Sequence, residues 1–350
     1  MHDVLYVLQP QTIPTTISLS SWRNPQIKER FSALHLADGG WICNVAAAES
    51  FSDLIADFPQ RSFSLAQSDS SADDEIHDEF FSVKRVDGDR ADIFVEMLIR
   101  ANWMLFADIE QTPFAVERAK LDTIDAAFRM LTAWVLGTPG RPVSRVTTWT
   151  SSGTDRQSMQ RWIRGHQIFA ALTQGLIAAF TELKSALIAD DAGPTMGATV
   201  DLAVALLHGA GASFEFTGDM PSDDYMTIIR PSMTPPLVPD SFSGLLSSDH
   251  RVLVGMLRGM KPLLDSLHER RPEAHARIAD ALSEVYDSHR FVCERLVGKS
   301  PSLMMSTVST KTGGDQIEKF KRLRMKAFEP SPAARVHNGI APAAATAPSN

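Results

Sequence analysis

The chain has 350 residues, of which 44% are hydrophobic, and a formal net charge of −8 at neutral pH. That size allows a large buried core, in one large domain or two smaller ones, whereas the acidic balance argues against a nucleic-acid surface, which needs concentrated Lys and Arg. With only Cys43 and Cys293, neither a disulfide framework nor a thiolate zinc cluster is available. The sequence shows neither a leader pattern nor a run of roughly eighteen uncharged apolar residues, so we expect a cytoplasmic protein without a membrane partner.

Periodic apolar residues predict helices along most of the chain, and strand signals are few. The predicted helices span residues 25–37, 41–57, 91–108, 113–136, 158–188, 195–208, 248–269, 272–297 and 314–328. Proline opens two of them, at Pro113 and Pro272, where its missing N–H would have no helical partner anyway. The pattern therefore predicts an all-α fold.

Two segments have compositions typical of irregular chain. Residues 60–78 are rich in Ser, Asp and Glu and are expected to form a mobile surface connection. Residues 330–350 consist mainly of Ala, Pro and Ser. Because they bury too little apolar area to offset the entropy of ordering, they are expected to form a disordered tail.

A single histidine, His289, lies in the apolar stripe of the helix predicted over 272–297. The stripe advances by four and three residues in turn, as one face of an α-helix does, through Ile278, Leu282, Val285, His289, Val292 and Leu296. A core histidine bonded to a backbone carbonyl would give this pattern. A metal-ligating imidazole would give it as well, and the residues that follow favour the ligand.

The segment 289–299 (HRFVCERLVGK), followed at a distance by Thr312-Gly313-Gly314, resembles the proximal-histidine segment of tryptophan 2,3-dioxygenase. That family has His, four residues, Glu-Arg, two apolar residues and Gly, and then a Gly-Thr-Gly-Gly loop. This chain differs in carrying residues 300–311 before the loop and Lys311 in place of the first glycine. The long insertion is more similar to indoleamine 2,3-dioxygenase.

Upstream segments are similar to a third haem enzyme of this superfamily, monodechloroaminopyrrolnitrin synthase of the pyrrolnitrin pathway. They are 145–149 (RVTTW), 156–158 (RQS) and 224–231 (DYMTIIRP). The resemblance implies a helical bundle that encloses a pocket for haem b. It also implies a haem-binding domain over 141–329 and a smaller helical region, 1–140, over the distal side. We further expect a homodimer.

The resemblance gives His289 the role of proximal iron ligand, which leaves the opposite axial position for dioxygen or another oxidant. Arg290 and Arg295 could pair with the haem propionates, although solvated helix-end cations would look the same in sequence. Thr312-Gly313-Gly314 offers a hydroxyl and unobstructed backbone N–H groups to a propionate or a substrate ammonium. An ordinary turn is the alternative there.

Arg230 is the candidate for binding a substrate carboxylate, since guanidinium presents a planar fork that matches a carboxylate. An arginine in a comparable place has this role in tryptophan and indoleamine dioxygenases, and Arg230 inherits it by similarity. Pro231 is expected to push Arg230 out of helical geometry and into a loop. The alternative is a structural ion pair with Asp223 or Asp224.

Four further residues are candidates for the substrate side. Ser243 and Gly244 lie in a proline-rich loop that could form one wall of a pocket. Trp149 could stack on an aromatic substrate, or it could be a core aromatic. His166 could act as a distal acid or base, although its polar neighbours also fit an exposed histidine.

These features predict a haem-dependent oxidative enzyme, either an oxygenase or a catalyst of oxidative rearrangement. Its predicted substrate is tryptophan or a related aromatic amino acid of specialised metabolism, with dioxygen or another oxidant. Two alternatives stay open: kynurenine-type dioxygenation of an indole, and a helical protein that binds haem or a small ligand without catalysis. Arg230 distinguishes an enzyme from the last alternative, because a protein that only carries oxygen does not need a buried arginine to bind a carboxylate.

Overall fold

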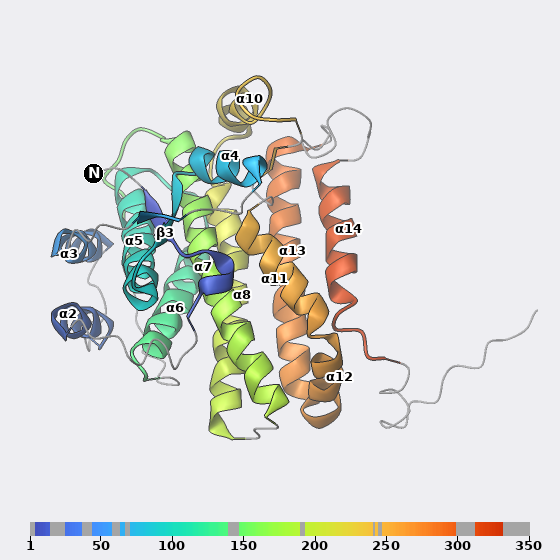
Figure 1. Cartoon of the computed structure of the whole chain (residues 1–350). Coiled ribbons are helices and arrows are strands. Elements are labelled where there is room, and N and C mark those ends of the chain that lie inside the picture. Colours follow the sequence, from blue (N-terminus) through green and yellow to red (C-terminus); the bar gives the residue numbers. More distant parts are fainter. Residues whose placement is uncertain are drawn as a thin grey trace, which may run out of the picture.

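The computed structural model describes residues 4–14, 25–36, 44–57, 64–66, 71–138, 147–189, 193–240, 242–243, 247–298 and 312–331. Within these ranges the chain is a helical bundle, which confirms the predicted fold class (Figure 1). Its α-helices are α2 (Pro25–Leu36), α3 (Asn44–Asp57), α4 (Ala72–Phe80), α5 (Arg90–Gln111), α6 (Arg118–Val135), α7 (Ser158–Ile188), α8 (Pro194–Thr217), α9 (Ser222–Asp224), α10 (Arg230–Ser232), α11 (Ser248–Gly259), α12 (Lys261–Arg270), α13 (Pro272–Val297) and α14 (Gly313–Met325). A 3-10 turn, η1 (Pro10–Thr12), and a π-helical turn, η2 (Tyr225–Ile229), accompany them.

The long helices α7 and α8 form the centre of the bundle. Helices α6 and α13 pack on α8, α5 packs on α7, and α14 packs along α13 (Figure 1). A Cβ atom at Gly209 of α8 would lie 2.5 Å from the Cβ of Ala127 on α6, so only glycine allows this close approach. The stretch Thr195–Thr217 is long and apolar enough to cross a membrane by length and composition, and most of it is buried inside the bundle.

Helices α7 and α13 have the bounds that periodicity predicts. On α13, Pro272 occupies the first turn, and the stripe residues Ile278, Leu282 and Leu296 are buried. The helix ends at Gly298, whose φ of +56° lies in the left-handed region that glycine adopts without steric cost. The apolar stripe therefore fixes which face of α13, and hence which side of His289, points inward.

Several predicted helix boundaries are wrong. The helix predicted from Pro113 begins at Arg118, so Pro113 does not lie in a first helical turn, and its carbonyl accepts from Arg161 instead. Helix α8 continues to Thr217 rather than ending at residue 208, because Gly209 and Gly211 pack closely on α6 and α13 and this tertiary contact offsets their poor helix propensity. The helix predicted over 248–269 is split at Met260 into α11 and α12. Pro262, in the first turn of α12, cannot donate to a continuing hydrogen-bond ladder.

A small sheet that the periodicity did not predict lies on the N-terminal side. Strand β1 (Leu5–Val7) pairs in parallel with β3 (Val83–Asp87), and β2 (Ser64–Leu65) pairs antiparallel with the other edge of β3. Residues 60–78 were expected to form a mobile surface connection, but those from Ala72 onward belong to helix α4, so the prediction is wrong there. There the Ser71 N–H and hydroxyl both donate to the Asp74 carboxylate and cap the helix. Of the tail predicted over 330–350, only 330–331 falls within the described residues.

The buried Arg85 ties the sheet to two helices. Its Nε donates to Asp78 of α4 over 2.7 Å, and its Nη2 donates to Asp249 of α11 over 2.8 Å. Its Nη1 donates to the Leu8 carbonyl over 3.0 Å. The two carboxylates outweigh burial and raise the pKa of Arg85 above its ordinary value. Strand β3 is therefore joined to α4 and α11.

Candidate active site

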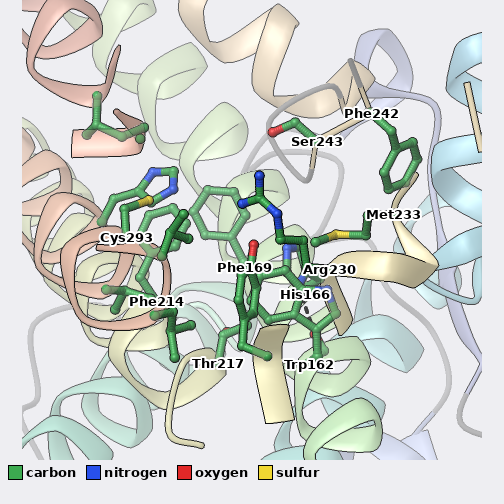
Figure 2. Close-up of a pocket in the computed structure, with 17 residues that line it drawn as sticks. Trp162, His166, Phe169, Phe214, Thr217, Arg230, Met233, Phe242, Ser243 and Cys293 are labelled. Atoms are coloured by element: carbon green, nitrogen blue, oxygen red, sulfur yellow. Dashed lines mark hydrogen bonds between the residues drawn. The ribbon is translucent and has the colours of Figure 1, made fainter. Parts of the chain in front are cut away.

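A cavity of about 120 Å³ lies between α7, α8, α13, α14 and the segment from η2 to Ser243. Its walls are largely aromatic, with Trp162 and Phe169 from α7, Phe214 from α8, and Phe242 (Figure 2). Concave apolar walls with a few polar groups are typical of cofactor and small-molecule sites. Four of the predicted polar site residues meet in this wall: His166, Arg230, Ser243 and His289.

Helix α13 places His289 in the cavity wall, where the ring stacks on Phe214 with 4.3 Å between centroids and 12° between planes. Burial, and to a smaller extent the neighbouring His250, lower the pKa of His289 to about 3. Among the described residues neither ring nitrogen of His289 has a hydrogen-bond partner. His289 is therefore a neutral imidazole with a lone pair that can coordinate a metal.

A second imidazole, His250 at the start of α11, lies close to His289 and was missed in the sequence. Its charged neighbours Asp249 and Arg251 are typical of a solvated helix start, so the pattern gave no signal. Burial lowers the pKa of His250 to about 4. Its Nδ1 is buried without a hydrogen-bond partner in the described part of the chain. His250 is therefore a second residue that could hold a metal.

Only one residue of the predicted loop Thr312-Gly313-Gly314 lines the cavity. Gly313, the first residue of α14, borders the cavity, and a Cβ at this position would lie 3.5 Å from the Cβ of Cys293. Thr312 is the N-cap of α14, and Gly314 packs on the side chain of Glu294. Cys293, one turn after His289, also lines the cavity, and burial raises the pKa of its thiol to about 12.

Arg290 and Arg295 do not line the cavity, which corrects the prediction that they face haem propionates. On a helix they lie about 100° and 240° around from His289. Arg290 pairs with Glu318 of α14 at 3.3 Å, and Arg295 donates to the Gly218 carbonyl just after α8. Both are helix-packing contacts rather than the solvated helix-end cations of the alternative.

Arg230 lines the cavity, but in helical rather than loop geometry, with φ −57° and ψ −44°. The N–H of Arg230 donates to the carbonyl of Tyr225, five residues earlier, so the hydrogen-bond ladder is already shifted before Pro231. In this wide turn residues five apart face the same way. Tyr225 and Arg230 both line the cavity, while Met226 and Ile228 are exposed. Figure 2 shows the Arg230 side chain reaching in among the aromatic residues.

His166 is enclosed by aromatic rings rather than exposed. Its ring stacks on Phe81 at 4.0 Å and lies 4.5 Å from Trp162. The Nδ1 is 2.7 Å from the Trp162 carbonyl, and since a carbonyl only accepts, the proton must be on Nδ1. Burial lowers the pKa of His166 to about 3. His166 therefore presents a neutral ring with the lone pair on Nε2.

Trp149 lies in the core, away from the cavity, so the prediction that it lines the substrate side is wrong. Its ring stacks on Phe106 at 5.3 Å, and its Nε1 donates to Asp122 over 2.8 Å. Ser243 lines the cavity, whereas Gly244 lies outside the described residues. The wall residues that the sequence did not reveal are Phe169, Phe214, Tyr225, Met233 and Phe242, whose inward orientation depends on tertiary packing.

The residues present fit a haem group. A neutral imidazole, His289, stands in an apolar wall. The Nδ1 of His250, buried and without a hydrogen-bond partner among the described residues, belongs to a ring near enough to lower the pKa of His289. Phe169, Phe214 and Phe242 offer the apolar surface that a porphyrin ring requires. The first turn of α14, at Gly313, carries helix N-terminal amides of the kind that stabilise an acidic group.

The fold and the cavity together define a helical enzyme that binds a small, largely aromatic molecule or cofactor. The family model described as SfmD 3-methyl-L-tyrosine peroxygenase matches residues 7–277, and this chain belongs to that family of oxidative enzymes. The 3-methyl-L-tyrosine peroxygenase of Streptomyces lavendulae is 29% identical over 274 residues, which cover 77% of this chain and 73% of that protein. A crystal structure of reduced SfmD, soaked with sodium hydrosulfite, has the same fold, with a TM-score of 0.67 and 24% identity over 81% of this chain and 95% of that chain.

These comparisons assign the chain to a family more specifically than its sequence motifs did. They show a peroxygenase family, which is an oxidative enzyme family as predicted. A particular likeness to the pyrrolnitrin enzyme, and tryptophan or indole as substrate, stay predictions. The family match ends at residue 277, twelve residues before His289, so the assignment of His289 depends on the cavity and the local motif.

The buried imidazoles predict an acid-sensitive fold. In the folded state His166, His250 and His289 have pKa values of about 3 to 4, against 6.5 when unfolded, so the unfolded chain binds more protons below pH 6.5. The three neutral imidazoles contribute fully to the free energy of unfolding above pH 6.5, and this contribution is lost as the pH falls towards 4. Urea unfolding of the haem-free protein should show a loss of about 1 kcal/mol per imidazole between pH 7.5 and 5.5.

The half-exposed His208 provides the control for this measurement. His208→Gln should leave the difference between the two pH values unchanged, whereas His166→Gln should reduce it by about one imidazole's share. Equal reductions in the two variants would contradict the assignment of the acid sensitivity to the cavity.

Proposed function

We propose that this chain is a haem-dependent peroxygenase that adds one oxygen atom from a peroxide to the ring of a tyrosine-type aromatic amino acid. The observation that carries the proposal is the meeting of His289 and Arg230 in one largely aromatic cavity. The first could hold iron and the second a carboxylate. The relative's substrate, a methylated tyrosine, supports the substrate class.

Haem, when bound, would supply an iron centre that activates the oxidant. His289 would hold the iron through a ring nitrogen, and the stack on Phe214 keeps the imidazole plane fixed. His250 could hold the iron from α11 or stay outside the coordination sphere. The amides at the start of α14, near Gly313, suit a propionate.

The substrate would be held at its polar end and stacked at its ring. Arg230 presents two parallel N–H donors to the α-carboxylate. Burial raises the pKa of Tyr225 to about 12, so its phenol stays protonated as a neutral donor near Arg230. Trp162, Phe169 and Phe242 give the aromatic ring an apolar wall that excludes water.

His166 would handle the proton of the oxidant. Because Nδ1 is committed to the Trp162 carbonyl, Nε2 is the atom that accepts a proton and returns it. Phe81, from the N-terminal part of the chain, stacks on this ring. That contact supports the proposal that region 1–140 covers the distal side of the site.

The substrate alternative is tryptophan, with dioxygen and kynurenine-type cleavage. To decide, the haem-loaded protein is incubated with tyrosine, 3-methyltyrosine or tryptophan, and with either ¹⁸O-labelled peroxide or ¹⁸O-labelled dioxygen plus a reductant. Mass spectrometry should find one labelled oxygen in a tyrosine-type product, supplied by peroxide. Two atoms from dioxygen in tryptophan would establish the alternative, and haem binding without any product would leave a non-catalytic haem protein.

A further inference from the structure

A small void adjoins the cavity at His166. His166 and Phe169 border both spaces. The void has room for about one water molecule. Its other walls carry polar side chains from three elements, α4, β3 and α11, and those that matter here are His77, Asp78, Arg85 and Asp249. The void is thus a polar chamber between the cavity and the small N-terminal sheet.

His77 and His166 meet this void from two helices, α4 and α7. Both rings pack on Phe81, with 4.9 Å and 4.0 Å between centroids. The charge of His77 also contributes to lowering the pKa of His166, which places the two rings near each other. Exchangeable groups thus lie on both sides of the void.

The path continues from His77 towards solvent. The Nδ1 of His77 lies 3.4 Å from Oδ1 of Asp78, and the Asp78 side chain is 13% exposed. Arg85 holds that carboxylate through its Nε at 2.7 Å and balances its charge, and Asp249 faces Arg85 from α11. Asp78 therefore has a fixed position at the outer end of the path.

We propose that His166, one water in the void, His77 and Asp78 form a proton relay between the cavity and the surface of α4. Nε2 of His166 takes up a proton from the cavity and gives it from the same atom to the water, because Nδ1 keeps its proton on the Trp162 carbonyl. The water in turn gives one of its own protons to Nε2 of His77. The Nδ1 proton of His77 then passes to the Asp78 carboxylate, which releases it to solvent. Each group gives one proton for each that it receives. The relay rests on the proposed function for its use, whereas its tests need no substrate, and the second of them needs no haem.

Cyanide binding to the ferric haem-loaded protein tests the relay without substrate or turnover. Hydrogen cyanide binds iron as the anion, so its proton must leave the cavity. His77→Gln should slow cyanide association by about tenfold, since a positioned proton acceptor is worth that or more. Added imidazole should restore the rate. His208→Gln, which removes a half-exposed histidine, should leave it unchanged.

A second measurement uses the haem-free protein. ¹⁵N NMR of labelled histidines should find His166 neutral with its proton on Nδ1, and His77→Gln should shift Nε2 of His166 while Nδ1 moves little. A purely structural role for His77 predicts that both nitrogens move together and that imidazole rescues nothing. An unchanged cyanide rate, or an unshifted Nε2, overturns the relay. A working relay in a protein that oxidises no aromatic amino acid would instead overturn the proposed function.

Discussion

Replacing Asp108 with Ala is expected to lower the free energy of unfolding by about 3–5 kcal/mol, the cost of leaving a buried charge without its partner. Asp108 accepts from Nε of Arg161 over 2.7 Å, and both side chains are at most 1% exposed. Arg161 also donates to Asp219 over 3.0 Å and to the Pro113 carbonyl over 2.9 Å. Burial raises the pKa of Asp108, although Arg161 and Arg164 favour its charged form.

The Asp108–Arg161–Asp219 network also joins α7 to the end of α8 at one end of the cavity. Arg161 belongs to α7, as Trp162 and His166 do, while Asp219 follows the end of α8. A matched control is Asp201→Ala, which breaks a 2.7 Å pair with Arg277 at half-exposed side chains. Surface pairs of this kind are worth about 0–1 kcal/mol. Similar losses for Asp108→Ala and Asp201→Ala in urea unfolding would show that burial of the network contributes nothing.

Replacing Arg230 with Gln is expected to weaken binding of an aromatic amino acid by about 100-fold, because a buried carboxylate would lose its charged partner. Arg230→Lys keeps the charge but loses the planar fork, so an intermediate loss is expected. The measurement is a titration of the haem-loaded protein, followed by the change in the haem absorption spectrum. Haem binding itself should not change, since the coordinating residues lie on other helices.

The matched ligand is the corresponding arylethylamine, which has no carboxylate. Its affinity should be the same for wild type and Arg230→Gln. Arg290→Gln is the matched protein control, because Arg290 lies outside the cavity and pairs with Glu318. If the amino acid and the amine lose affinity alike, Arg230 shapes the cavity rather than binding the carboxylate.

Elements with strong local patterns could be predicted from the sequence. The apolar stripe and Pro272 gave α13 its bounds and directed His289 inward, since both signals act within one helix. Helix α4 was missed because the Ser and Asp residues that suggested disorder are the ones that cap it. The small sheet joins strands up to about 80 residues apart, a pairing that periodicity within one window does not record.

The residues of the candidate site likewise divide into those with a local sequence signal and those without one. His289 and Arg230 were found because each belongs to a local motif. Phe214 and His250 have no local signal, and only the packing of α8 and α11 brings them beside His289. Trp149, Arg290 and Arg295 were misplaced for the opposite reason, since their motif neighbours lie close in sequence while their side chains point elsewhere.

The most direct test of the account is a hemin titration of wild type, His289→Ala and His208→Ala, followed by absorption spectra of the ferric, ferrous and CO-bound forms. We expect stoichiometric haem with a histidine-ligated spectrum in wild type and His208→Ala, and loss of that spectrum in His289→Ala. A wild-type protein that takes up no haem, or a His289→Ala protein with the wild-type spectrum, would contradict it.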